Sequence, residues 1–193
     1  MPSACPLFLE SDMDIGEMRD FVRSVRDGFA EQVLRCMDEN RYEMVLDVRE
    51  QLYGGVDGDD RPLSPSYSQD PWFTDPMAGY FDDDLGHWVS CFMHPERYVA
   101  WKRRITPPEK GARLGLAPRP DDRPNLFIVG TFHGSIDARA TSGGVELFTF
   151  GWEQGPAVES KYGSQIFGLG AAATGHFNDA FLWPWLRSWM EGL

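Results

Sequence analysis

The feature that most constrains the fold of this chain is an amphipathic stripe near its N-terminus. Between residues 14 and 37, apolar side chains recur at spacings of three and four, which places them along one face of a helix. Asp14 precedes the pattern and Glu17 follows it by three residues, an Asp variant of the capping box. The pattern therefore predicts a long N-terminal helix, weakened only at Gly28. Its apolar positions are Ile15, Met18, Phe21, Val22, Val25, Phe29, Val33 and Cys36.

Short elements and long loops are predicted for the middle of the chain. Residues 43–48 favour a short strand followed by one helical turn, with the start of a second helix running to Tyr53 as the alternative. Residues 54–84 are dense in Gly, Pro, Asp and Ser, which indicates a long loop. Residues 85–104 predict one helix or two short helices broken at His94, because Pro95 disfavours helical geometry in the residue before it. A proline-rich connector follows at about 105–124.

The last third of the chain predicts a hairpin and two helices. Residues 136–140 and 145–150 flank a Gly-Gly centre, which is typical of a β-hairpin. Residues 156–162 suit a helix that stops at Gly163, and residues 178–190 carry aromatic side chains at helical spacing, with Pro184 as a kink or late start. We therefore expect an α+β fold with a long N-terminal helix, a small antiparallel sheet and a C-terminal aromatic helix. The length favours one domain over residues 1–193.

Charge and composition narrow the classes of function. The net charge is −12, which disfavours an overall grip on nucleic-acid phosphates, so no sequence-specific nucleic-acid binding is expected. Only residues 96–123 are basic, with 8 Lys and Arg against 4 Asp and Glu. No window approaches a membrane-spanning length, and residues 1–6 do not resemble a signal peptide, so we expect a soluble, untargeted protein. Cys5, Cys36 and Cys91 show no disulfide pattern, which fits a reducing cytoplasm.

Two groups of residues are candidates for a partner interface. Trp101, Arg103 and Arg104 belong to the basic stretch, and Trp and Arg are enriched at the energetic centres of interfaces. The alternative is a solvated loop, with a partner of protein or DNA left open. Trp183, Trp185 and Trp189 form the second group, and by the alternative interpretation these rings fill the core.

Three patterns invite a chemical interpretation that the residues do not support well. On a helix, His87, Cys91 and His94 would share a face, as zinc ligands do, but their spacing matches no zinc motif and a fourth ligand is missing. Residues 168–175 are glycine-rich without the lysine of a phosphate-binding loop, which favours a hinge or helix stop. His133, near a serine and an aspartate, lies in no nucleophile-elbow motif and fits turn chemistry. We assign no catalytic residue, metal or cofactor.

A succession of short signatures resembles a protein family. The signatures are residues 51–53 (Gln-Leu-Tyr), 57–58 (Asp-Gly), 67–68 (Tyr-Ser), 126–132 and 162–169 (Tyr-Gly-Ser-Gln-Ile-Phe-Gly-Leu). In this order they resemble a family of small virion proteins of tailed bacteriophages and prophages of Bacteroidetes-type hosts. The chain departs from that pattern at residues 129–131, at His133 and in residues 70–94.

The family is similar in layout to siphovirus neck and tail-completion proteins. The resemblance implies a virion structural protein, not an enzyme, that forms a homo-oligomeric ring at the head-to-tail joint. Its partners would be portal, connector or tail proteins, after synthesis in the cytoplasm of the host bacterium. Two alternatives stay open: a metal-dependent hydrolase that uses His87, Cys91 and His94, and a monomeric adaptor for host interaction.

Overall fold

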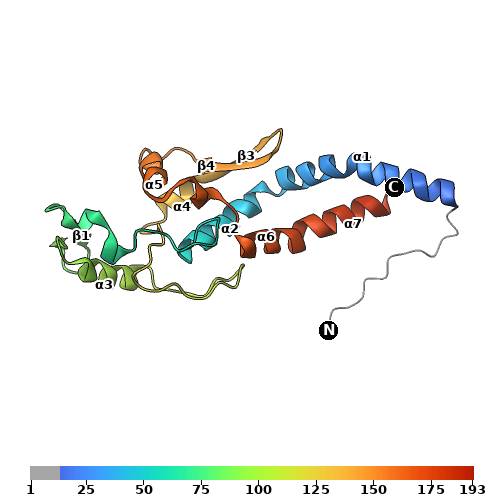
Figure 1. Cartoon of the computed structure of the whole chain (residues 1–193). Helices are drawn as coiled ribbons and strands as arrows, with labels where there is room; N and C mark the ends of the chain where they lie inside the picture. The colour runs from blue at the N-terminus through green and yellow to red at the C-terminus, as the bar shows by residue number, and fades with distance from the viewer. Residues whose placement is uncertain (1–13) are drawn as a thin grey trace.

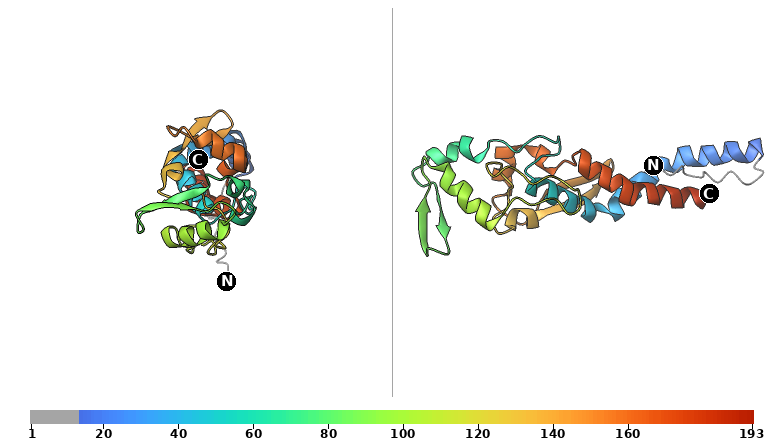
Figure 2. Two further views of the ribbon diagram at one scale, coloured as in Figure 1. Left: turned by 90° about the vertical axis from the view of Figure 1, so that its left-hand side faces the viewer. Right: turned by 90° about the horizontal axis from the view of Figure 1, so that it is seen from below.

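The computed structural model describes residues 14–193 and shows an elongated molecule (Figure 1). We divide it into three regions. The arm is the pair of helices α1 (Ile15–Glu39) and α7 (Trp183–Glu191). The body surrounds α2 (Arg41–Tyr53) and the hairpin β3–β4, and the distal end holds the hairpin β1–β2 and α3 (Pro95–Ile105). Figure 2 shows the arm and the distal end at opposite ends of the long axis.

The arm confirms the predicted N-terminal helix. The Asp14 carboxylate accepts from the Glu17 N–H at 2.8 Å, and the Glu17 carboxylate accepts from the Asp14 N–H at 3.0 Å. This reciprocal capping box satisfies two N–H groups at the helix start. Beside α7, Gly28 leaves room for the Trp189 ring, since a Cβ at residue 28 would lie 2.8 Å from Trp189 Cζ2. The first turns of α1 extend past the end of α7 (Figures 1 and 2).

The C-terminal helix is longer than its sequence pattern predicts. It runs through α6 (Ala171–Phe177), the π-helical turn η4 (Asn178–Leu182) and α7 without leaving helical dihedral angles at the junctions. Pro184 lacks an N–H and crowds the carbonyl four residues earlier, and the wider π-turn lies where that conflict arises. The expectation of a hinge or helix stop at residues 168–175 is wrong, because Ala171 begins a helix there.

The strand favoured at residues 43–48 is wrong, and the alternative of a second helix running to Tyr53 is confirmed. These residues lie within α2, which follows α1 after a break at Asn40. Val45, Val48 and Leu52 are all buried and are spaced by three and four, so they form one helical face. Packing of that face against β3 (Ile136–Thr141) overrides the strand preference of two β-branched valines.

Both small sheets are antiparallel pairs. The predicted hairpin is confirmed as β3 and β4 (Gly144–Thr149), with Ile136 opposite Thr149. A second pair, β1 (Gly79–Asp82) and β2 (His87–Ser90), replaces the helix predicted to begin at residue 85. The predicted break at His94 is confirmed as the start of α3, with Pro95 in its first turn.

The remaining elements are short. They are η1 (Tyr67–Gln69), η2 (Pro71–Thr74), α4 (Thr131–Ser135), α5 (Gly155–Tyr162), which ends at Gly163 as predicted, and η3 (Ser164–Phe167). The connector at 106–124 holds no helix or strand.

Within residues 14–193, the buried apolar side chains form three clusters. One lies in the body around Leu52 and Ile166, one joins α1 to the C-terminal helix around Cys36 and Phe177, and one at the distal end contains Cys91. Cys36 and Cys91 are buried free thiols, and Cys5 lies outside the described residues. Within residues 14–193, no helix is both long and apolar enough to span a bilayer. The fold is α+β, as predicted.

Candidate functional site

Three of the segments that carry the sequence resemblance, residues 51–53, 57–58 and 162–169, meet in the body. Gln51, near the end of α2, reaches the chain that follows η3. Its Nε2 donates to the Gly168 carbonyl at 3.0 Å, and its Oε1 accepts from the Gly170 N–H at 2.7 Å. Gln51 is 2% exposed, so its amide satisfies backbone groups with little access to water.

The turn after α2 packs against the same segment. The Gly58 N–H donates to the Gln165 carbonyl at 2.9 Å. A Cβ at residue 58 would lie 2.4 Å from the Gly168 Cα, so glycine is required for the two backbones to approach this closely. The Asp57 carboxylate accepts from two N–H groups of its own turn. These signature residues therefore connect the two loops and hold the body together.

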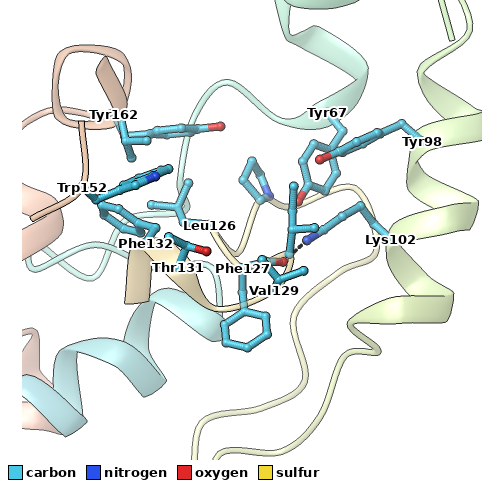
Figure 3. Close-up of a pocket in the computed structure, with 13 residues that line it drawn as sticks. Tyr67, Tyr98, Lys102, Leu126, Phe127, Val129, Thr131, Phe132, Trp152 and Tyr162 are labelled. Carbon is cyan, nitrogen blue, oxygen red and sulfur yellow. Dashed lines mark hydrogen bonds between the residues drawn. The ribbon is translucent and has the colours of Figure 1, made fainter. Parts of the chain in front are cut away.

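A cavity of about 340 Å³ lies between the body and the distal end (Figure 3). Its walls come from η1, α3, residues 124–132, Trp152 and α5. Most of the lining is aromatic or aliphatic, and the hydroxyls of Tyr98 and Tyr162 point toward one another from opposite sides (Figure 3). Burial raises the pKa of both phenols and raises that of Tyr67 to about 12. All three phenols therefore stay protonated at neutral pH and can donate hydrogen bonds.

One wall of the cavity carries a buried lysine. Lys102, on α3, is 1% exposed, and its Nζ donates to Asn125 Oδ1 at 2.8 Å and to the Phe127 carbonyl. Burial, with a smaller contribution from the positive charge of Arg119, lowers the pKa of Lys102 to about 7. No carboxylate in residues 14–193 forms an ion pair with this amine.

Hydrogen-bond donors outnumber acceptors around the lysine. Arg119 is 3% exposed and donates to the carbonyls of Thr106 at 2.6 Å and Arg123 at 3.2 Å. Its Nε has no partner, and neither has the Nδ2 of the buried Asn125. Because unpaired buried donors are costly, this part of the molecule is electropositive and short of acceptors.

His133 forms a hydrogen bond with the backbone beside the cavity. Its Nε2 lies 2.9 Å from the Asn125 carbonyl, which assigns the proton to that nitrogen. Burial, together with the positive charges of Arg49 and Lys102, lowers the pKa of His133 to about 4. Ser135 Oγ donates to the Phe132 carbonyl, and the Asp137 carboxylate accepts from the N–H of Ala138. Each of these groups thus engages a separate backbone atom, as turn chemistry predicts.

The predicted interface residues of α3 are largely engaged within the chain. Trp101 stacks on Tyr80 of β1 with ring centroids 4.4 Å apart. Arg104 pairs with Asp82 at 2.9 Å and with Asp84 at 3.2 Å, and Arg103 pairs with Asp121 at 3.2 Å. The Arg103 side chain is nevertheless 69% exposed.

The C-terminal tryptophans separate into two roles. Trp185 Nε1 donates to Gln32 Oε1 at 3.1 Å, and the Trp189 ring lies over Gly28, so both rings hold α7 against α1. Trp183 is 55% exposed beside Pro184 and Arg187. Of the three rings, Trp183 has the surface that a partner can reach.

The helical face proposed for His87, Cys91 and His94 is wrong. His87 lies in β2, where its Nδ1 lies 3.1 Å from the Leu85 carbonyl, and His94 contacts Glu96. Cys91 is buried in the distal aromatic cluster. No group of three or more potential metal ligands occurs among the residues that the structure describes.

Large apolar side chains are exposed at both ends of the molecule. On α1 they are Ile15, Met18, Val22 and Phe29, which we call the arm face. On the distal hairpin they are Phe81, Leu85 and Trp88, which we call the hairpin face. Phe81 lies directly opposite Trp88 in the register, so the two side chains share one side of the hairpin. Ile15 is 89% exposed although it belongs to the apolar stripe that predicts α1.

Sequence reasoning missed Lys102 and Asn125 as a pair. Lys102 lies among other basic residues, in a stretch whose composition indicates either a partner interface or a solvated loop. The available signal was its spacing of four from Tyr98, which places the amine on the same helix face as a buried aromatic ring.

Comparison of the chain with protein-family models, with curated proteins and with solved structures finds no match.

Proposed function

We propose that this chain is a structural subunit of a tailed-bacteriophage virion that packs with its own copies into a ring at the head-to-tail joint. The observation that carries the proposal is the location of the arm face and the hairpin face at opposite ends of an elongated molecule. Contact between two different surfaces is heterologous, and such contacts generate a ring when the rotation between neighbours closes.

Burial of both faces would supply the energy of assembly. Transfer of one large apolar side chain from water contributes about 1.5–3 kcal/mol. Each face has several such side chains, and contiguous exposed apolar surface is characteristic of protein interaction sites. Trp183 and Arg103 add an exposed ring and an exposed guanidinium, of the residue types that dominate interface energetics.

The sequence resemblance supports the same role. Gln51 and Gly58, which belong to its signatures, hold the body as one unit between the arm and the distal end. A joining subunit needs such a rigid spacer between its two contact surfaces. The net charge of −12 would also let a ring pass DNA without binding it. The expected partners are portal, connector or tail proteins, and the expected location is the virion.

The decisive experiment measures particle mass by light scattering and mass photometry across protein concentration. Wild type should form a closed oligomer. Variant I15S/V22S, which removes part of the arm face, and variant F81S/W88S, which removes part of the hairpin face, should each stay monomeric. F150S is the matched control, because Phe150 is 72% exposed but belongs to neither face. It should assemble like wild type.

Mixing the two variants tests the head-to-tail geometry. Each keeps the face that the other lacks, so an equimolar mixture should form dimers and nothing larger. An F81S/W88S variant that dimerises alone would reveal an arm-to-arm contact and overturn the ring. A wild-type protein that remains monomeric at all concentrations, alone and with tail-tube or portal proteins, would overturn the joining role.

A further inference from the structure

The cavity in Figure 3 combines an apolar interior with an unmatched positive charge. Aromatic rings from three separate segments, Tyr67, Trp152 and Tyr162, line it, and no Asp or Glu belongs to its lining. The Lys102 amine lies in its wall, bonded to two neutral carbonyl oxygens. A protonated amine has three N–H donors, so one donor remains after these two contacts.

The environment of Lys102 supplies no compensating charge. Burying an ammonium group is costly unless an anion pairs with it. The neighbouring ionisable groups are Arg119 from the connector, His133 from α4, Tyr67 from η1, and Tyr98 and Tyr162 from α3 and α5. None of these is an anion at neutral pH, and Arg119 repels the lysine. The carboxylate of Asp70 acts on the three tyrosines, but it forms an ion pair with Lys161 and does not contact Lys102. A carboxylate entering the cavity would therefore meet an electropositive site that is already desolvated.

The shape of the lining specifies the rest of the ligand. Phe132, Val158 and Leu126 offer apolar contact, and the hydroxyls of Tyr98 and Tyr162 offer hydrogen-bond donors. Small-molecule sites in proteins are commonly of this kind, with mostly apolar walls and a few convergent polar groups. Leu126 has a positive φ of 51°, a backbone conformation that non-glycine residues seldom adopt and that is concentrated at ligand-binding sites.

We propose that this cavity binds a small carboxylic acid with an aromatic or branched apolar body, whose carboxylate pairs with the amine of Lys102 and accepts from a tyrosine hydroxyl. The site is separate from the arm face and the hairpin face, so the proposal stands independently of ring assembly. Binding would supply the missing counter-charge and would favour the protonated amine over the neutral one.

The test compares 3-phenylpropionate with its neutral isostere, 3-phenylpropionamide, by calorimetry and by NMR titration of the full chain at pH 6.5. The acid should bind about tenfold more tightly than the amide or better. Titrations in buffers of different ionisation enthalpy at pH 7.5 should show proton uptake on binding of the acid. Affinity for the acid should decline as pH rises above 7, where the amine loses its proton.

Two variants assign the effect to one side chain. K102M keeps a chain of similar length without the charge, and it should abolish the preference for the acid. K110M is the matched control, since Lys110 is an exposed residue of the same basic stretch, and it should bind like wild type. Circular dichroism of K102M establishes that the variant is folded. Equal affinity of acid and amide, failure of both to bind at about 5 mM, or a preference that survives in K102M would each overturn the proposal.

Discussion

The body and the two ends of this molecule use their side chains in opposite ways. In the body, Gln51 and Asp47 are almost fully buried, and each makes polar contacts with segments distant in sequence. At the ends, large apolar side chains such as Ile15 and Trp88 face solvent. The body thus buries polar side chains beside its apolar core, whereas the two ends leave large apolar side chains in contact with solvent.

The difference separates the contacts that specify the fold from the side chains that are available for association. Buried polar contacts over long sequence distances select one arrangement of α2, the connector and the C-terminal helix. The exposed apolar faces contribute little to the stability of the isolated chain. Their removal should therefore affect assembly without unfolding the chain.

The Asp47→Ala substitution should destabilise the body strongly. The Asp47 side chain is 0% exposed, and its carboxylate pairs with Arg113 Nε at 3.0 Å and His176 Nδ1 at 2.9 Å. Removing one partner of a buried pair costs about 3–5 kcal/mol. We expect about 3 kcal/mol, because Arg113 keeps Glu43 as a partner. Urea unfolding monitored by tryptophan fluorescence measures the loss.

Asp20→Ala in the arm is the control for that substitution. Asp20 pairs with Arg23 at 2.9 Å, but both side chains are more than half exposed, at 61% and 53%. Exposed pairs are worth about 0–1 kcal/mol. Equal losses of unfolding free energy in Asp47→Ala and Asp20→Ala would show that the body is no more tightly specified than the arm.

Two identical glycine substitutions compare the arm with an open helical site. Gly175→Ala, in α6, places a methyl group where nothing lies within 4 Å, and should stabilise the helix by about 0.5–1 kcal/mol. Gly28→Ala carries the same propensity gain but presses on the Trp189 ring at 2.8 Å. Overpacking costs about 1–3 kcal/mol, so Gly28→Ala should be destabilising overall.

Hydrogen exchange locates the effect of Gly28→Ala. Exchange should accelerate in α7 and in the facing turns of α1, while the amides of β3 and β4 should keep their protection. Uniform acceleration through the body would mean that the arm and body unfold as one unit, which would remove the distinction between them.

The sequence predicts the arm and the β3–β4 hairpin because both signals are local. The Asp14 capping box, the three-four spacing and the Gly-Gly turn each lie within a few residues of the structure they specify. The strand predicted at 43–48 was wrong because Val45 and Val48 have β propensity, whereas their burial against β3 depends on residues far along the chain.

The cavity could not be predicted for the same reason. Tyr67, Lys102 and Tyr162 belong to three segments that converge only after folding, and Lys102 has the composition of a solvated basic tract. Its partner Asn125 lies between a proline-rich connector and a turn, where no periodicity indicates burial. Likewise, the exposure of Ile15 depends on where α7 ends, which the pattern of α1 does not contain.

The pH dependence of stability tests the buried lysine. The folded pKa of Lys102 is about 7 and its ordinary value is 10.5, so between these values the unfolded chain binds more protons. Stability due to this group should therefore rise with pH, by up to about 1.4 kcal/mol per pH unit. The difference in unfolding free energy between wild type and K102M isolates the contribution of Lys102, because the contributions of the other titrating groups cancel. A difference that is constant from pH 7 to 9 would contradict burial of the amine.

The smallest effect on folding is expected for Arg103→Ala, at the distal end. Its partner Asp121 lies 3.2 Å away, and the arginine side chain is 69% exposed, so its removal should change the unfolding free energy by less than about 1 kcal/mol. If Arg103 contacts a neighbouring subunit, the same variant should raise the concentration needed for assembly by about tenfold, which mass photometry measures.

Arg61→Ala is the matched control, because Arg61 also forms one exposed ion pair, with Asp59 at 3.2 Å, but lies in the body. A change in assembly for Arg61→Ala as large as that for Arg103→Ala would attribute the effect to net charge. An effect confined to Arg103 would assign it to the distal end, where a side chain that folding does not need is free to serve association.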